Sequence, residues 1–91
     1  MSERLWRVEL APAAARQLRK LPPDATARLR APILALGFEP HPPGVARLAG
    51  TLFWRLRVGH LRIVYAIDDE KRLVVVLRVA RRAESTYRRI G

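Results

Sequence analysis

The sequence contains no cysteine, few acidic residues and no long apolar run. Without cysteine it can form neither a disulfide framework nor a thiolate zinc site. The longest uninterrupted aliphatic run is Leu73–Leu77, whereas a membrane-spanning helix needs roughly 20 apolar residues. Arg7 and Glu9 interrupt the N-terminal stretch before the apolar core of a signal peptide can develop. These absences predict a cytoplasmic protein that has no membrane partner.

Acidic residues are too few to balance the basic ones, so this short chain carries a large positive charge. The 91 residues include 18 basic and 8 acidic side chains, which gives a formal net charge of +10, and 16 of the basic residues are arginine. A codon bias can explain arginine in place of lysine, but it cannot explain the excess of positive charge. We therefore expect an anionic partner, a nucleic acid first and an acidic protein second. The length predicts a single domain over residues 1–91.

The first half of the chain has the apolar spacing of one strand and two helices. Leu5–Leu10 alternates as a strand does, and Pro12 then suits the first turn of a helix over about Ala13–Leu21. Two prolines follow, after which a second helix is expected over about Asp24–Gly37, with the aspartate as its cap. Pro32 should kink this second helix or shift its start. Together the two helices predict an antiparallel helical hairpin.

The second half of the chain changes to a period of two. After a loop over residues 38–50, alternation predicts three strands, joined by turns at Gly59-His60 and at residues 68–71. These strands form an antiparallel meander, which the N-terminal strand is expected to join. The tail over residues 83–90 is either a short last helix or an extended end. The predicted fold class is α+β, with the helical hairpin on one face of a twisted antiparallel sheet.

Alternation along the three strands separates an apolar face from a face rich in arginine. The apolar positions, which must face the helices, are Leu52, Trp54, Leu56 and Val58, then Leu61, Ile63, Tyr65 and Ile67, then Leu73, Val75, Leu77 and Val79. The opposite face collects Arg55, Arg57, Arg62 and Arg78, together with Phe53, a candidate for stacking on a nucleobase. Neighbouring like charges repel, so this face costs stability unless an anion lies on it. The pattern predicts an anion-binding surface.

Few other residues offer chemistry. The glycines fit neither a dinucleotide fingerprint nor a phosphate-binding loop, and the histidines lie in different loops, so we expect no cofactor and no metal. Tyr87 could swing over the arginines from the end of the chain. His60 is a candidate acid–base residue, although a histidine in a turn is more often a bystander. Such a site could cleave RNA if the ribose 2′-hydroxyl attacks its own 3′ phosphate, the arginines neutralise the phosphorane and Tyr87 assists proton transfer.

Several motifs, taken in their order and spacing, give the chain a family likeness. They are the early strand, Leu18-Arg19-Lys20-Leu21, Leu48-Ala49-Gly50, Trp54–Asp68, Val75–Arg82 and Tyr87. On these residues the chain resembles the RelE/ParE superfamily of type II toxin–antitoxin toxins over nearly its whole length, and more closely the RelE branch. The resemblance implies a ribosome-dependent endoribonuclease that cuts mRNA in the ribosomal A site, beside the 16S rRNA, and is neutralised by a RelB-like antitoxin. It also implies a monomeric free toxin and a hetero-oligomeric toxin–antitoxin complex.

The resemblance further implies roles for individual residues. It places catalytic or phosphate-binding groups at Arg55, Arg57 and Arg62, a late catalytic arginine at Arg82 and a late tyrosine at Tyr87. Arg81, and Arg78 from its place on the arginine-rich face, are expected to help bind RNA, with a solvated or structural role as the alternative for Arg78. Arg81 is also the alternative to Arg82 for the late catalytic position. Relatives often carry lysine at the first two positions, where this chain has arginine, which suits phosphate binding.

Four functions remain open on the sequence. The first is an mRNA-cleaving toxin, and the second is a ParE-like poison of DNA gyrase that has the same fold and no nuclease activity. The third is a nucleic-acid-binding module that cleaves nothing. The fourth is an inactive toxin homologue that only binds its antitoxin. The arginine set with a late tyrosine favours the first, because a gyrase poison has no need for these residues.

Overall fold

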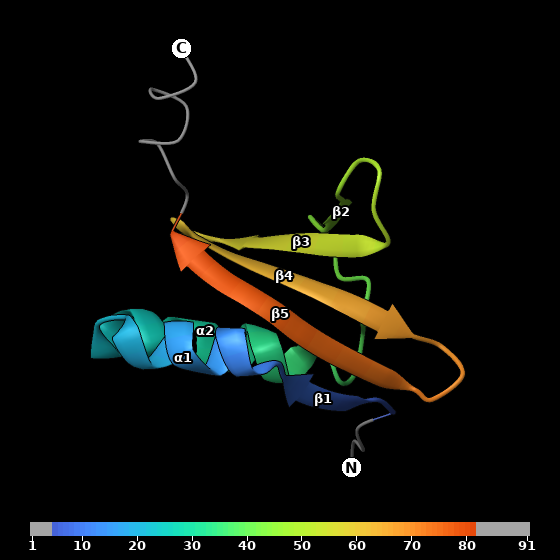
Figure 1. Ribbon diagram of the computed structural model, residues 1–91, viewed down its shortest axis with the longest axis horizontal. Coiled ribbons are helices and arrows are strands. Elements are labelled where there is room, and N and C mark those ends of the chain that lie inside the picture. The colour runs from blue at the N-terminus through green and yellow to red at the C-terminus, as the bar shows by residue number, and fades with distance from the viewer. Residues whose placement is uncertain (1–4, 82–91) are drawn as a thin grey trace.

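One strand and two helices precede four further strands in the computed structural model, which describes residues 5–81 (Figure 1). The elements are β1 (Arg7–Leu10), α1 (Pro12–Lys20), α2 (Pro23–Ala35), β2 (Ala46–Arg47), β3 (Phe53–Val58), β4 (Leu61–Asp68) and β5 (Leu73–Arg81). The predicted helical hairpin and the three-stranded meander are both present. No helix in this part of the chain is long and apolar enough to cross a membrane.

Both helices begin at a proline. Proline suits the first helical turn because its missing N–H would have had no partner there, and its fixed φ matches the helix. Asp24 was expected to cap α2, but it lies inside the first turn, where its charge favours the positive end of the helix dipole. The helix continues through Pro32 to Ala35 without the predicted shift of its start to that proline.

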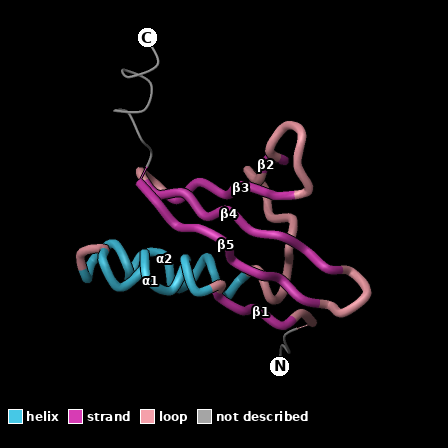
Figure 2. The backbone as a smooth tube through the Cα atoms, viewed as in Figure 1, coloured by secondary structure: helices cyan, strands magenta, loops and turns pink. Residues whose placement is uncertain are grey.

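The sheet has the strand order β1-β5-β4-β3-β2. Figure 2 shows β3, β4 and β5 as neighbouring strands joined by short turns, and this antiparallel meander is as predicted. β1 instead pairs in parallel with β5, so the sheet is mixed and the prediction of a wholly antiparallel sheet was wrong. Alternation fixes which face a residue occupies but not the direction in which a strand pairs. The two-residue strand β2, inside the predicted loop, extends the sheet beyond β3.

A β-bulge changes the alternation in the middle of β5. Val76 pairs with Tyr65 and Arg78 pairs with Val64, so Leu77 lies between them as an extra residue without a partner on β4. The extra residue inverts the face of every position that precedes it. The core therefore receives Val74, Val76 and Val79, whereas the sequence pattern predicted Val75 and Leu77 in the core. A regular strand in phase with Val74 and Val76 would have turned the charged Arg78 into the core.

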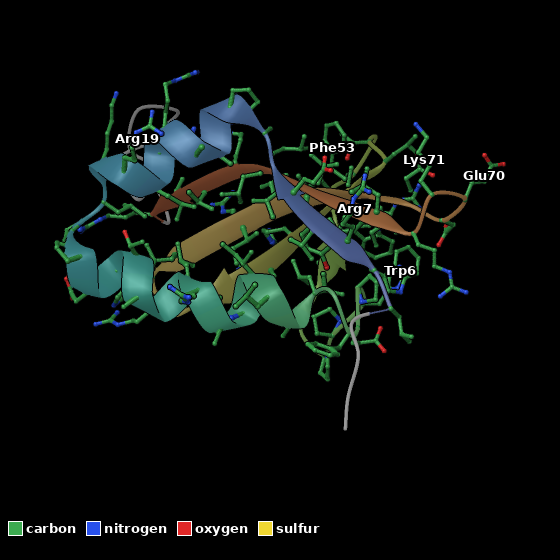
Figure 3. All side chains as sticks on the ribbon, turned by 90° about the horizontal axis from the view of Figure 1, so that it is seen from below. Trp6, Arg7, Arg19, Phe53, Glu70 and Lys71 are labelled. Atoms are coloured by element: carbon green, nitrogen blue, oxygen red, sulfur yellow. The ribbon has the colours of Figure 1, made fainter. Side chains whose placement is uncertain are left out.

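The core lies between the helices and one face of the sheet. Seen from below, both helices lie in front of the strands (Figure 3). The buried residues are Ala14, Ala25, Leu29, Ile33 and Leu36 from the helical half of the chain, and Leu61, Ile63, Tyr65, Val74, Val76 and Val79 from the sheet. Leu52, predicted in the core, precedes β3 and is 74% exposed. The opposite face of the sheet has no helix from residues 5–81 packed on it.

Candidate nucleic-acid interface

Four arginines share the face of the sheet that the helices leave open. In the register of β3 and β4, Arg57 lies directly opposite Arg62, and Arg55 lies opposite Val64. Val64 in turn lies opposite Arg78 on β5. Residues that are paired across strands project from the same face, so the four guanidinium groups lie together as the alternation predicted. We call Arg55, Arg57, Arg62 and Arg78 the arginine face.

The four arginines differ in their burial. Arg55 and Arg62 are half-buried, and the Nε atom of each is fully buried without a hydrogen-bond partner in the described chain. Arg57 and Arg78 are exposed. A buried N–H group without a partner costs about 1–3 kcal/mol, and more when the group is charged. The arginine face thus has two buried donors that no acceptor within residues 5–81 satisfies.

No carboxylate within residues 5–81 neutralises this charge. The two ion pairs there join Arg7 to Glu9 at 3.2 Å, on the edge strand β1, and Arg28 to Asp24 at 3.8 Å, on α2, so neither pair includes an arginine of the arginine face. Arg57 and Arg62, by contrast, oppose each other directly as like charges, which destabilises a sheet. Such a concentration of unpaired positive charge attracts a polyanion.

Phe53 places an aromatic ring on the same face. It lies two residues before Arg55 in β3 and opposite Ala66, and it is 40% exposed. Trp54 lies on the other face, where it packs against the core, as predicted. There the guanidinium carbon of Arg47 lies 5.5 Å from the centre of the Trp54 ring, and the His41 ring lies edge-on at 4.8 Å. Within residues 5–81, Phe53 is therefore the aromatic side chain available for stacking beside the arginines.

The remaining predicted site residues are not all brought to this face. His60 is exposed in the turn between β3 and β4, which joins the strands of Arg57 and Arg62. Arg81 lies opposite the core residue Leu61, so the register turns it toward the helix side of the sheet. Arg82 and Tyr87 lie outside the described residues.

Tyr65 is a core residue, as its parity predicted. Its side chain is fully buried, and its hydroxyl donates a hydrogen bond of 2.6 Å to the carbonyl oxygen of Pro40. Burial, with a smaller contribution from the negative charge of Glu39, raises the pKa of Tyr65 to about 12. This hydroxyl therefore stays protonated at neutral pH and anchors the loop that follows α2.

The helix side of the molecule offers a different surface. An apolar groove of about 770 Å³ is lined by Val8, Leu10, Leu18, Arg19, Leu21, Pro23, Thr26, Ala27, Arg30, Ile33 and Leu34. It contains no carboxylate, imidazole or phenol. Figure 3 places Arg19 at the helical end of the molecule, far from Glu70 and Lys71 at the β4–β5 turn. Within residues 5–81, no three His, Cys, Asp or Glu side chains group as metal ligands.

The chain matches a family model along most of its length. Residues 8–86 match the model described as the ParE toxin of the type II toxin–antitoxin system parDE. The chain belongs to the RelE/ParE superfamily of toxins. No curated protein gives a significant match. The predicted membership of this superfamily is thus confirmed.

Solved structures of RelE toxins share the fold of this superfamily member. The RelBE2 toxin–antitoxin complex of Mycobacterium tuberculosis is 32% identical with a TM-score of 0.76, and the match covers 91% of this chain and 98% of that chain. The RelE–RelB complex of Pyrococcus horikoshii OT3 is 24% identical with a TM-score of 0.77, over 88% and 98% of the two chains. The RelBE complex of Escherichia coli is 24% identical with a TM-score of 0.71, over 84% and 95%. The predicted RelE-like fold is confirmed.

Proposed function

We propose that this chain is the toxin of a type II toxin–antitoxin module and that it inhibits translation by cleaving mRNA at the ribosome. The observation that carries the proposal is the arginine face, which joins four guanidinium groups on three neighbouring strands without a carboxylate from residues 5–81. An RNA backbone supplies the acceptors and the negative charge that this surface lacks. Translation is cytoplasmic, so we propose that the toxin acts there.

In the proposed reaction, the 2′-oxygen of one ribose attacks the adjacent phosphorus and the bond to the 5′-oxygen of the next nucleotide breaks. The 2′-hydroxyl loses a proton and the leaving 5′-oxygen gains one, so the products are a 2′,3′-cyclic phosphate and a 5′-hydroxyl. Arg57 and Arg62 stabilise the negative charge that grows on the phosphorane, together with Arg82. Tyr87 assists proton transfer, and His60 is a further candidate for that role.

Arginine is a poor proton donor at neutral pH, because its pKa lies above about 12. The arginine face therefore contributes charge stabilisation rather than acid–base catalysis. A substrate that the ribosome holds in line for attack offsets this weakness, since correct orientation alone lowers a barrier by about 7–11 kcal/mol. This dependence supports the A site as the place of cleavage, with mRNA and the 16S rRNA as the neighbouring nucleic acids.

An acidic RelB-like antitoxin is the proposed protein partner. The solved relatives from M. tuberculosis, P. horikoshii and E. coli are toxin–antitoxin complexes. Acidic side chains on the arginine face would neutralise the charge that otherwise attracts RNA. We propose a monomeric free toxin and a hetero-oligomeric complex, whose dissociation constant rises with ionic strength.

The rival function is poisoning of DNA gyrase without nuclease chemistry, and the ParE description of the matching family model favours it. The two functions predict different molecular damage. A gyrase poison leaves mRNA intact and changes DNA supercoiling, whereas an mRNA-cleaving toxin leaves supercoiling unchanged. An RNA-binding module or an inactive homologue would produce neither change.

Primer extension on a reporter mRNA in a translating extract tests the proposal. We expect cuts within codons for the wild-type protein and none on naked RNA. Arg62→Ala should lower cleavage by about 100-fold or more, in the range of a lost transition-state donor. Arg30→Ala is the matched control, because it removes the same charge from an exposed site on α2. Intact mRNA in the extract, together with arrested growth of cells that express the protein, would overturn the nuclease proposal. A supercoiling assay would then be the next experiment.

A further inference from the structure

The arginine face is built from two rows of the same composition. In the first row, the half-buried Arg62 lies directly opposite the exposed Arg57. In the second row, the half-buried Arg55 and the exposed Arg78 lie on either side of Val64. Each row has one arginine whose Nε is buried without a hydrogen-bond partner in the described chain. The rows therefore offer two anion-binding positions rather than one.

The spacing of the two rows suits a single RNA strand. Arg55 and Arg57 are two residues apart on β3, which is about 7 Å along a strand. This separation is comparable to the distance between neighbouring phosphates of a single-stranded backbone. Phe53 lies two residues before Arg55 on the same face. Along β3, from its end toward its start, the face therefore presents the row of Arg57 and Arg62, the row of Arg55 and Arg78, and then an aromatic ring.

The second row depends on the bulge at Leu77. Because Val74 and Val76 face the core, only the extra residue returns Arg78 to the open face. The backbone is also fixed from the helix side, where the N–H of Val79 donates a 2.8 Å hydrogen bond to Oε1 of Gln17 on α1. In the first row the matching position on β5 is Ala80, opposite Arg62. The bulge thus adds an arginine on β5 to the second row alone.

We infer that Arg55 and Arg78 bind a second RNA phosphate, next to the scissile phosphate at Arg57 and Arg62. Val64 forms the apolar floor between the two guanidinium groups, which approach the phosphate from strands about 10 Å apart. Two arginines at that separation bind one phosphate oxygen each. This inference rests on the proposed function for the identity of the nucleic acid, and it assigns Arg78 to binding and positioning rather than to catalysis.

The test uses a short single-stranded RNA with a 2′-O-methyl group at the cleavage position, which prevents reaction. Fluorescence anisotropy measures its affinity for wild type, Arg78→Ala and the control Arg30→Ala between about 50 and 200 mM salt. The slope of log K against log salt is negative, and losing one phosphate contact should make it shallower by about 0.7. We expect this change for Arg78→Ala, with a 5- to 10-fold weaker affinity (about 1–1.4 kcal/mol), and a smaller change for Arg30→Ala.

Neutral linkages then identify the phosphate. A set of probes carries one methylphosphonate each, either at the linkage beside the blocked position or further away. The adjacent neutral linkage should weaken wild-type binding by more than Arg78→Ala does, because it also removes the partner of Arg55, and it should weaken Arg78→Ala by less than it weakens wild type. Equal slopes for Arg78→Ala and Arg30→Ala would overturn the inference. So would a methylphosphonate effect that adds fully to the mutation, or wild-type binding that is insensitive to every single neutral linkage.

The two proposals fail separately. If the protein cuts mRNA in the extract and Arg78→Ala behaves like Arg30→Ala, the second phosphate row is wrong and the nuclease proposal stands. If wild type cuts no RNA while the adjacent methylphosphonate and Arg78→Ala remain coupled, the cleavage proposal is wrong and the second row stands as a binding site.

Discussion

The two faces of one sheet have opposite properties although they come from the same strands. Arg62 and Ile63 are consecutive residues of β4, yet Arg62 lies on the open arginine face and Ile63 is fully buried under the helices. One face holds the protein together and has no charged side chain in its core. The other carries four like charges. In β3 and β4, side-chain parity separates apolar packing from positive charge, so substitutions at neighbouring positions there should act on different properties.

The largest expected effect on stability comes from the covered face. Ile63→Ala should lower the free energy of unfolding by about 2–5 kcal/mol, because it leaves a cavity in a close-packed core. Arg62→Ala, one residue away, should not lower it, because the substitution removes a buried N–H group without a partner and the like charge opposite Arg57. Urea unfolding of the two purified variants measures both values. A comparable loss for Arg62→Ala would show that the arginine face contributes to folding, contrary to the separation of the two faces.

Tyr65→Phe should have the next largest effect, a loss of about 1–3 kcal/mol, because it removes the hydroxyl bonded to the Pro40 carbonyl. The effect should depend on pH. Since folding raises the pKa of Tyr65 from 10.0 to about 12, its contribution is complete below about pH 10 and is lost as the pH rises toward 12.

Urea unfolding at about pH 8 and about pH 11 tests this dependence. The difference in stability between wild type and Tyr65→Phe should be smaller at the higher pH. A difference that grows at high pH would contradict the direction of the pKa change.

Phe53→Ala should separate binding from folding on the open face. If the ring stacks on a base, the substitution should weaken RNA binding by about 1–3 kcal/mol. Because Phe53 is 40% exposed, its effect on unfolding should be smaller than that of Ile63→Ala. Anisotropy with the uncleavable RNA measures the first quantity, and Phe53→Tyr should restore binding. Unchanged affinity for Phe53→Ala would leave the arginines as the only contacts on this face.

Arg57→Gln should produce the smallest change, a gain of less than about 0.5 kcal/mol in stability, since it removes the like charge opposite Arg62. The gain should shrink as salt screens the repulsion. Thermal unfolding at low and high ionic strength measures it. A destabilised variant would mean that the two arginines attract a shared counter-ion strongly enough to support the fold.

Much of the fold could be predicted where charged and apolar residues alternate along a strand. In β3 and β4, arginine alternates with large apolar residues, so parity alone placed Arg55, Arg57 and Arg62 on one face and Ile63 and Tyr65 on the other. The first half of β5 has no such alternation, because Leu73–Leu77 are all apolar. Either set of alternate residues could therefore face the core. The phase was predicted incorrectly there for that reason.

Arg78 was correctly predicted on the open face of the sheet, but the alternation used for β5 assigned the wrong residues to the core. Counting in twos from Leu73 places Arg78 on the open face only if Val75 and Leu77 are in the core, which they are not. A bulge has no signature in a run of uniform apolar residues, and its energetic reason is the cost of burying Arg78. The direction of β1 was equally hidden, because four residues carry too little pattern to decide between parallel and antiparallel pairing.

The pairing of β1 with β5 has a consequence for the order of synthesis. It joins the first of the described strands to the last of them, Arg7 lying beside Leu73, so the sheet cannot be completed until β5 has left the ribosome. Contacts between such distant segments form late and slow folding. The second arginine row has the same requirement, since Arg78 belongs to β5. A nascent chain thus assembles this surface only after β5 has been synthesised and has left the ribosome.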